Sequence, residues 1–370
     1  MNLQHLADQI KLWGNELGFQ KIGITDVNLS SHEEGLKKWI AHGYHGSMEW
    51  MERNEDKRLH PDKLHPGTLR VISVRLDYLP PDAHFASNLS DPTQAYISRY
   101  ALGRDYHKLM RNKLKNLAKK IEDELGELNY RPFVDSAPVL ERPLAEKAGL
   151  GWTGKHSLLL DEEAGSWFFL GELLIGLPLP ADAPVENQCG KCRSCITSCP
   201  TGAIIEDGVI DARKCISYLT IEYDGIIERE LSDAMGNRIY GCDDCQLVCP
   251  FNRHAQLTQQ ADFHRRESIK DSNLIMLFLW SEQEFLKNFE GSAIRRIGHL
   301  QWLRNLAIAL GNGAYSDEAI TTLESRLGLC DVLDHHIAYA IERLKSQTPF
   351  TSTKQQRLIR IVQKGLPRDA

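Results

Sequence analysis

Apolar residues recur every three or four positions along residues 2–19, which predicts an amphipathic helix with one buried face. The same spacing predicts helices over residues 31–42, with Ser31 as the N-cap, 105–125 and 139–148. Short apolar runs predict strands over residues 21–25, 70–79, 130–134, 157–160 and 167–174, the last two in one sheet. The polar stretches 48–66 and 80–95 are predicted as loops. Strands that alternate with helices indicate an α/β or α+β segment of about 180 residues.

The pattern changes twice further along the chain. Residues 177–187 are rich in proline and predict a linker, and the region after residue 255 is almost purely helical. Helices are predicted over residues 294–310, 317–327, 334–344 and 355–363, and antiparallel pairs of this length are typical of HEAT-like repeats. The domains are therefore predicted at residues 1–180 (α+β), 181–255 (cysteine-rich) and 256–370 (all-α and HEAT-like).

The middle segment contains a cysteine run that binds 4Fe–4S clusters in bacterial ferredoxins. The spacing of two, two and three residues, followed by proline, occurs at Cys189, Cys192, Cys195 and Cys199. A second run, Cys242, Cys245 and Cys249, lacks its first cysteine, because position 239 is Ile239. Cys215 is the nearby cysteine that can supply the missing thiolate.

In two-cluster ferredoxins, the last cysteine of each run ligates the other cluster. This rule predicts one set of Cys189, Cys192, Cys195 and Cys249, and a second set of Cys199, Cys215, Cys242 and Cys245. A pair of zinc sites is the alternative, but zinc spacing does not require the third cysteine or the proline. The segment therefore predicts two 4Fe–4S clusters and electron transfer, with Cys330 left over as a core residue.

Composition and charge predict the cellular compartment and indicate a candidate binding surface. The chain is 42% hydrophobic and 25% charged, its longest apolar run has seven residues, and no secretory signal precedes it, so a cytoplasmic location without a membrane is predicted. Residues 256–370 carry 15 Lys and Arg against 13 Asp and Glu, whereas the whole chain has net charge −6. The last 20 residues hold five Lys and Arg, including Arg368, against Asp369 alone. This basic tail is either a solvated helix face or a surface for a polyanion.

Two further motifs are candidate functional sites, and the sequence supports one of them better than the other. Residues 149–154 match GxGxxG, but a predicted helix precedes them and a strand follows, which is the reverse of a dinucleotide site. Asp135 ends an apolar strand, where partial desolvation is expected to raise the pKa of its carboxyl group and suit it to proton donation. A helix N-cap is the other explanation for Asp135.

Together these motifs resemble one family over essentially the whole chain, most weakly beyond residue 260. Val134-Asp135-Ser136 and the turn at residues 145–151 precede the first cysteine run, and the segments 215–220 and 240–246 follow it. The combination is similar to epoxyqueuosine reductases, cobalamin and iron–sulfur enzymes that complete queuosine in tRNA, and more distantly to reductive dehalogenases.

The resemblance implies a corrinoid-binding first domain and reduction of the epoxide of epoxyqueuosine at the tRNA wobble position. It implies Asp135 as the proton donor and places a set of residues near cobalamin, namely Arg58, Ser98, Asp135, Leu159, Ser217 and Asp243. The expected partners are tRNA, through its anticodon stem-loop and the basic tail, and an external electron donor, with the protein a monomer. The alternatives are a reductive dehalogenase acting on a small molecule and a non-catalytic ferredoxin-type carrier, although a carrier leaves the first 180 residues unexplained.

Overall fold

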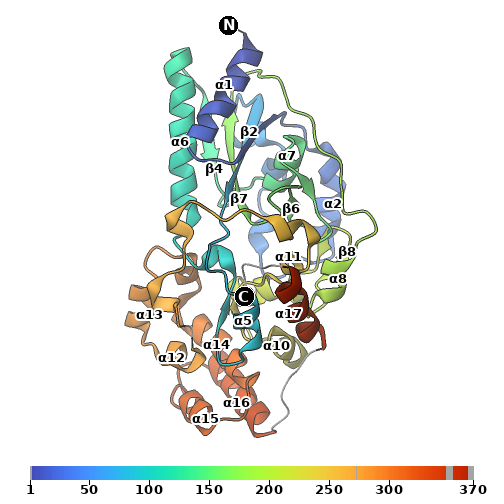
Figure 1. Cartoon of the computed structure of the whole chain (residues 1–370). Helices are drawn as coiled ribbons and strands as arrows, with labels where there is room; N and C mark the ends of the chain where they lie inside the picture. Colours follow the sequence, from blue (N-terminus) through green and yellow to red (C-terminus); the bar gives the residue numbers. More distant parts are fainter. Residues whose placement is uncertain (1, 272, 347–352, 366–370) are drawn as a thin grey trace.

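The computed structural model describes residues 2–271, 273–346 and 353–365. A four-stranded sheet lies in the upper part of Figure 1, with the order β1 (Lys21–Thr25), β2 (Arg70–Asp77), β7 (Phe168–Ile175) and β4 (Tyr130–Phe133). Every neighbouring pair in this sheet is antiparallel. The first segment is therefore of the α+β kind rather than a parallel α/β sheet.

The sheet is buried on both faces, and alternate residues of β2 point to different helices. Ile72 and Val74 belong to the same core as Leu6 of α1 (Leu3–Glu16) and Leu114 of α6 (Tyr106–Leu125). Val71 instead packs with Leu144 of α7 (Glu141–Lys147) on the opposite face. This double burial explains why apolar residues stand at consecutive positions of β2, Val71 and Ile72, instead of strictly alternating with polar ones.

Several predicted loops contain short helices. The stretch 48–66 holds η1 (Glu49–Met51), α3 (Glu55–Leu59) and α4 (Pro61–Leu64), and the stretch 80–95 holds α5 (Phe85–Ser90). The three apolar residues of α5, Phe85, Ala86 and Leu89, are buried, although polar residues surround them in the sequence. Helix α2 (Ser30–Ala41) has Leu29 at its N-cap, so Ser31 does not cap it as predicted.

The strand predicted over residues 157–160 needs correction, and the turn predicted after α7 can be checked. Residues 159–160 form β6 (Leu159–Leu160), which pairs with β5 (Trp152–Thr153) in a separate ribbon and not with β7. The GxGxxG stretch follows α7 and leads into β5, so the turn expected there is confirmed. Strand β3 (Tyr96–Ile97) and the 3₁₀ helix η2 (Arg99–Ala101) precede α6.

The cysteine-rich segment is built from short elements that are tied to the rest of the chain. They are α8 (Ser194–Ser198), β8 (Ile204–Glu206), β9 (Val209–Ile210), η3 (Ala212–Lys214), α9 (Ile216–Ile221), α10 (Arg229–Met235), β10 (Arg238–Tyr240) and α11 (Asp244–Leu247). Strand β10 pairs in parallel with β3, and one core cluster contains Leu114, Leu247 and Leu358. The packing therefore continues across the predicted boundaries, which remain predictions.

The remainder of the described chain is helical. After η4 (Pro250–His254), η5 (Ala261–Phe263) and η6 (Glu267–Ile269) come α12 (Leu274–Leu279), α13 (Glu282–Asn288), η7 (Ala293–Ile297), α14 (Gly298–Gly311), α15 (Asp317–Glu324) and α16 (Asp331–Lys345). Helices α14 and α16 pack against each other, and Cys330 at the start of α16 is half-buried. No described helix is both long and apolar enough to span a membrane.

The final helix departs from the predicted pairing. Helix α17 (Thr353–Gly365) packs against α5, α8 and α11, so it covers the cysteine-rich segment instead of completing a repeat with α16 (Figure 1). Leu358 and Val362 are buried in that contact, and Lys354 Nζ donates to the carbonyl oxygen of Cys199 at 2.9 Å. Arg368 and Asp369 of the predicted basic tail lie outside the described residues.

Candidate functional site

The first predicted cysteine set lines a single cavity. Cys189, Cys192, Cys195 and Cys249 surround a space of about 170 Å³, and His156 and Phe251 complete much of its wall. Cys195 lies on α8, whereas Cys249 is 54 positions away in the sequence and follows α11, which packs against α8. Four thiols around one space form a donor set that suits a 4Fe–4S cluster.

The second predicted set gathers beside the first. Burial raises the pKa of the Cys245 thiol well above its usual value, and nearby Cys215 and Cys199 raise it further. Cys242 is buried as well and lies in the field of Cys245. Cys195 of the first set also acts on Cys245, so the two sets are neighbours. Cysteine binds metal as the thiolate, so a cluster at this set would have to displace these protons.

Asp135 lies in the turn between β4 and α7, in the left-handed backbone conformation with φ of 53°. Its Oδ2 is 3.4 Å from Nε2 of His107, in the first turn of α6. The other ring nitrogen, Nδ1, is 2.6 Å from Oδ1 of Asp105, which also caps α6. The imidazole is thus held between two carboxylates from different elements.

This arrangement decides where the proton resides. A hydrogen bond with His107 lowers the pKa of Asp135, although burial opposes that shift. Burial alone would lower the pKa of His107, but Asp105 and Asp135 together raise it to about 9. The expectation of a raised pKa for Asp135 is therefore wrong, because the hydrogen bond with His107 outweighs the effect of desolvation. At neutral pH the His107 imidazolium carries the proton and Asp135 is ionised.

A second pair of acidic groups lies behind Asp135. Glu141 Oε1 accepts the backbone N–H of Asp135 at 2.6 Å and fixes the turn. Burial raises the pKa of Glu141 to about 7, and it raises that of Glu172, on β7, well above its usual value. Glu172 is 0% exposed. The pair thus retains a proton at neutral pH, close to Asp135.

The residues predicted near cobalamin are only partly brought together. Asp243 is fully buried and accepts hydrogen bonds from Ser98 Oγ at 2.6 Å, Tyr96 Oη at 2.9 Å and the Arg99 backbone N–H at 3.0 Å. Because both of its carboxylate oxygens accept hydrogen bonds from the protein, Asp243 holds Ser98 in place. Arg58 is buried and acts electrostatically on Asp135. Leu159 lies in an apolar cluster with Phe168, and Ser217 is half-buried on α9.

Three polar side chains of this region are partly open to solvent and yet have shifted pKa values. Arg142 is exposed to water, yet burial is the main cause of its lowered pKa. Tyr100 and Tyr106 are half-buried, yet burial raises the pKa of each well above its usual value. Arg58 Nε is also buried with no hydrogen-bond partner among the described residues, which leaves it free for a large polar cofactor.

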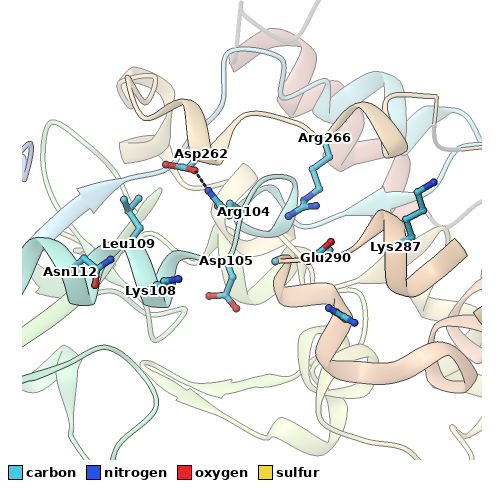
Figure 2. Close-up of a pocket in the computed structure, with 11 residues that line it drawn as sticks. Arg104, Asp105, Lys108, Leu109, Asn112, Asp262, Arg266, Lys287 and Glu290 are labelled. Atoms are coloured by element: carbon cyan, nitrogen blue, oxygen red, sulfur yellow. Dashed lines mark hydrogen bonds and ion pairs between the residues drawn. The ribbon is translucent and has the colours of Figure 1, made fainter. Parts of the chain in front are cut away.

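A basic groove opens next to His107. A space of about 790 Å³ lies between the start of α6 and the region of α13 (Figure 2). A second space of about 520 Å³ adjoins it along α6. Three carboxylates line the two spaces, against the His107 imidazolium and seven Lys and Arg side chains: Arg104, Lys108, Arg111, Lys115, Arg266, Lys287 and Arg295. Only Arg104 among them forms an ion pair drawn in Figure 2, with Asp262 at 3.3 Å. We call this surface the basic groove. It suits a polyanion.

Sequence reasoning did not identify His107 or most of these cations. Asp105 and His107 carried a detectable signal, since a capping aspartate two residues before a histidine at a helix start places both on one turn. The cations of the groove come from three separate stretches, and only folding brings them together. No side chain of α17 lines the groove, so the basic tail and the groove are distinct surfaces in the described part of the chain.

Comparison with known proteins identifies the family. Residues 58–136 match the family model described as epoxyqueuosine reductase QueG, DUF1730, and residues 188–252 match a 4Fe-4S double cluster binding domain. The epoxyqueuosine reductase of Aliivibrio fischeri is 69% identical over the full length of both chains, and that of Escherichia coli is 59% identical over 100% of this chain and 99% of its own.

Solved structures agree with this assignment. A crystal structure of epoxyqueuosine reductase with an epoxyqueuosine-modified tRNA stem loop superposes with a TM-score of 0.84 at 27% identity, covering both chains completely. The Bacillus subtilis enzyme, in a structure whose catalytic aspartate loop is swung out of the active site, gives a TM-score of 0.83 at 27% identity and covers 99% of this chain and 100% of its own. The chain belongs to the epoxyqueuosine reductase family.

Proposed function

We propose that this chain reduces the epoxide of epoxyqueuosine at the wobble position of tRNA to the alkene of queuosine. The observation that carries the proposal is the juxtaposition of the Asp105–His107–Asp135 arrangement with the basic groove, in a chain that also holds two adjacent cysteine sets. The family membership and the structure of a relative bound to a modified stem loop support the same substrate.

The reaction requires two electrons and two protons, since the epoxide oxygen leaves as water and the two carbons become an alkene. The two cysteine sets would hold 4Fe–4S clusters, which would supply electrons one at a time. Cobalamin, when bound, would supply a cobalt centre able to accept single electrons and act as a strong reductant. Arg58, Ser98, Asp135, Leu159, Ser217 and Asp243 are the residues proposed to hold this cofactor.

The chain's own residues supply the protons. Asp135 is the proposed acid that faces the departing oxygen, and His107 is the group that holds the proton in the resting protein. Asp135, which is ionised in the resting protein, takes the Nε2 proton of His107 across the 3.4 Å contact and then passes it to the departing oxygen. Glu141 fixes the Asp135 turn by accepting its backbone N–H. It also shares with Glu172 a proton that can reprotonate His107 and Asp135 after the reaction.

The basic groove provides a path for the stem loop. Its cations can contact backbone phosphates, which position a nucleic acid without reading its sequence. The wobble nucleotide must leave the base stack to reach Asp135. An external protein that donates single electrons, a monomeric state and a cytoplasmic location complete the proposal, and the exposed Cys192 gives a donor access to the first cluster.

The test uses protein reconstituted anaerobically with iron, sulfide and cobalamin. An anticodon stem loop carrying epoxyqueuosine is incubated with the reduced protein, and the nucleosides are separated and identified by mass. Formation of queuosine supports the proposal. Turnover of a small halogenated phenol with no turnover of the stem loop would instead assign the chain to dehalogenation.

A further inference from the structure

Two buried N–H groups beside the first cysteine set have no partner. His156 and Trp152 are each 1% exposed. His156 Nε2 and Trp152 Nε1 make no hydrogen bond with any described residue. Buried donors are nearly always satisfied, so two orphans in one place call for an acceptor that the polypeptide itself does not provide.

The tautomer of His156 follows from its other nitrogen. The backbone N–H of Leu158 donates to His156 Nδ1 at 3.2 Å, so Nδ1 is the acceptor nitrogen and carries no proton. A neutral ring must then carry its proton on Nε2, which makes Nε2 a donor. Burial agrees with neutrality, because it lowers the pKa of His156 to about 4. The turn itself is fixed, since the Gly154 N–H donates to the carbonyl oxygen of Leu158 at 2.8 Å.

Both residues lie beside cysteines of the first set. His156 lines the same cavity as Cys189, Cys192, Cys195 and Cys249. Trp152 is buried in one apolar cluster with Cys249 and Leu160, with Cys189 and Phe251 packed against it. Its ring meets that of Phe251 edge-on, with 4.9 Å between the centroids. The acceptor that fits both orphans is therefore sulfur at this cavity.

We propose that His156 Nε2–H, assisted by Trp152 Nε1–H, donates a hydrogen bond to sulfur of the cluster bound by Cys189, Cys192, Cys195 and Cys249, and so raises the reduction potential of that cluster. Reduction adds one negative charge to a cluster, so an N–H dipole that points at sulfur stabilises the reduced form more than the oxidised form. Hydrogen bonds to sulfur are among the factors that set these potentials.

The second set has a contrasting environment. Cys242 Sγ lies 3.4 Å from Oδ1 of Asp244, a buried carboxylate that is ion-paired with Arg238. A carboxylate beside a cluster thiolate disfavours added negative charge. The two environments give the two clusters different reduction potentials. The first electron therefore reduces the cluster whose ligands include the exposed Cys192. This inference concerns the double-cluster segment alone and holds whatever substrate the enzyme reduces.

The experiment is a redox titration of the reconstituted protein followed by electron paramagnetic resonance. In His156→Leu, the ratio of reduced to oxidised first cluster at a fixed potential should fall about tenfold, which for one electron is a shift of about 59 mV to more negative potential. His156→Gln, whose amide can still donate, should recover part of the shift. In deuterated water, the wild-type signal should lose a strongly coupled exchangeable proton that His156→Leu already lacks.

Trp302→Phe is the matched control for Trp152→Phe. Trp302 is 0% exposed, and its Nε1 also has no partner among the described residues, but it packs against Phe285 and Phe289 in the helical region. Trp152→Phe should lower the potential of the first cluster alone, and Trp302→Phe should change neither cluster. A fully iron-loaded His156→Leu protein with unchanged potentials would overturn the proposal. So would loss of half the iron from both His156→Leu and His156→Gln, because His156 would then maintain the site rather than tune it.

Discussion

Replacing Asp135 by Asn tests the proposed proton path most directly. The amide keeps the shape of the side chain and can still hydrogen-bond, but it cannot relay a proton from His107 to the substrate. The variant should load both clusters, bind cobalamin and bind the stem loop as the wild type does. Its single-turnover rate should fall by at least about a hundredfold, the lower end of what general acid catalysis typically contributes, ~10²–10⁴-fold.

The structure also gives the size of the effect on His107. The rise in the pKa of His107 from 6.5 to about 9 corresponds to about 3 kcal/mol in favour of the imidazolium. The pKa of His107 is higher in the folded protein than in the unfolded chain. This contribution to folding stability is therefore fully present below pH 6.5 and is lost as the pH rises through about 9. Removing the Asp135 charge, 3.4 Å away, should lower the pKa of His107 by about 1–3 units. Asp105 remains to hold it above the value that burial alone would give.

Several other charged groups act on this arrangement and stay in place in the variant. They are Glu141 on α7, Arg296 on η7, Arg58 on α3 and, one turn along α6, Arg111, which donates to Ser136 Oγ at 3.1 Å. None of them contacts His107 as closely as the two aspartates do. The change in the pKa of His107 can therefore be assigned to the lost carboxylate.

Two measurements check the prediction. Nuclear magnetic resonance of labelled histidine follows the pKa of His107 without substrate, and rapid-quench single turnover with the modified stem loop follows the chemical step across pH 6–10. Asp105→Asn is the control, because it also removes one carboxylate from His107 while an asparagine can still cap α6. It should move the alkaline limb of the rate profile to lower pH but leave the rate on the acidic side within about tenfold of wild type. If Asp135→Asn turns over at the wild-type rate, the proton reaches the oxygen by another route; if it loses cobalamin, Asp135 holds the cofactor instead.

Four further substitutions test the metal ligands and the nucleic-acid surface. Cys215→Ala should leave near half of the iron in the reconstituted protein, whereas Cys330→Ala should leave the iron content unchanged; full iron and an unaltered reduced-state spectrum in Cys215→Ala would remove it from the ligand set. Lys108→Glu in the basic groove should weaken stem-loop binding and reduce the slope of log affinity against log salt by about one or more, since phosphate contacts release counterions. Arg360→Glu, on the exposed face of α17, distinguishes the two basic surfaces. If Arg360→Glu weakens stem-loop binding and Lys108→Glu does not, the stem loop binds the tail instead of the groove. Deleting residues 351–370 is a poorer test, because it also strips Leu358 and Val362 from the core and should disturb the cluster spectra.

The sequence identified the parts whose chemistry is local. Cysteine spacing depends only on ligand geometry over a few residues, so the pairing of Cys249 with the first run could be written down before any fold was known, and the same four cysteines line one cavity. The long helices and the strands of the first segment were predictable for a similar reason, because periodic burial leaves its pattern in the sequence. Asp135 was singled out by its place at the end of an apolar strand.

Only the tertiary structure decided how these parts act on one another. The pKa of Asp135 was predicted in the wrong direction because its sign depends on His107, 28 positions earlier, and electrostatic contacts act through space rather than along the chain. The position of α17 on the cysteine-rich segment is likewise invisible in its amphipathic pattern, which predicts that one face is buried but not against which partner. The basic groove and the orphaned His156 donor arise in the same way. Each depends on which side chains meet, and that is fixed only when distant segments pack together.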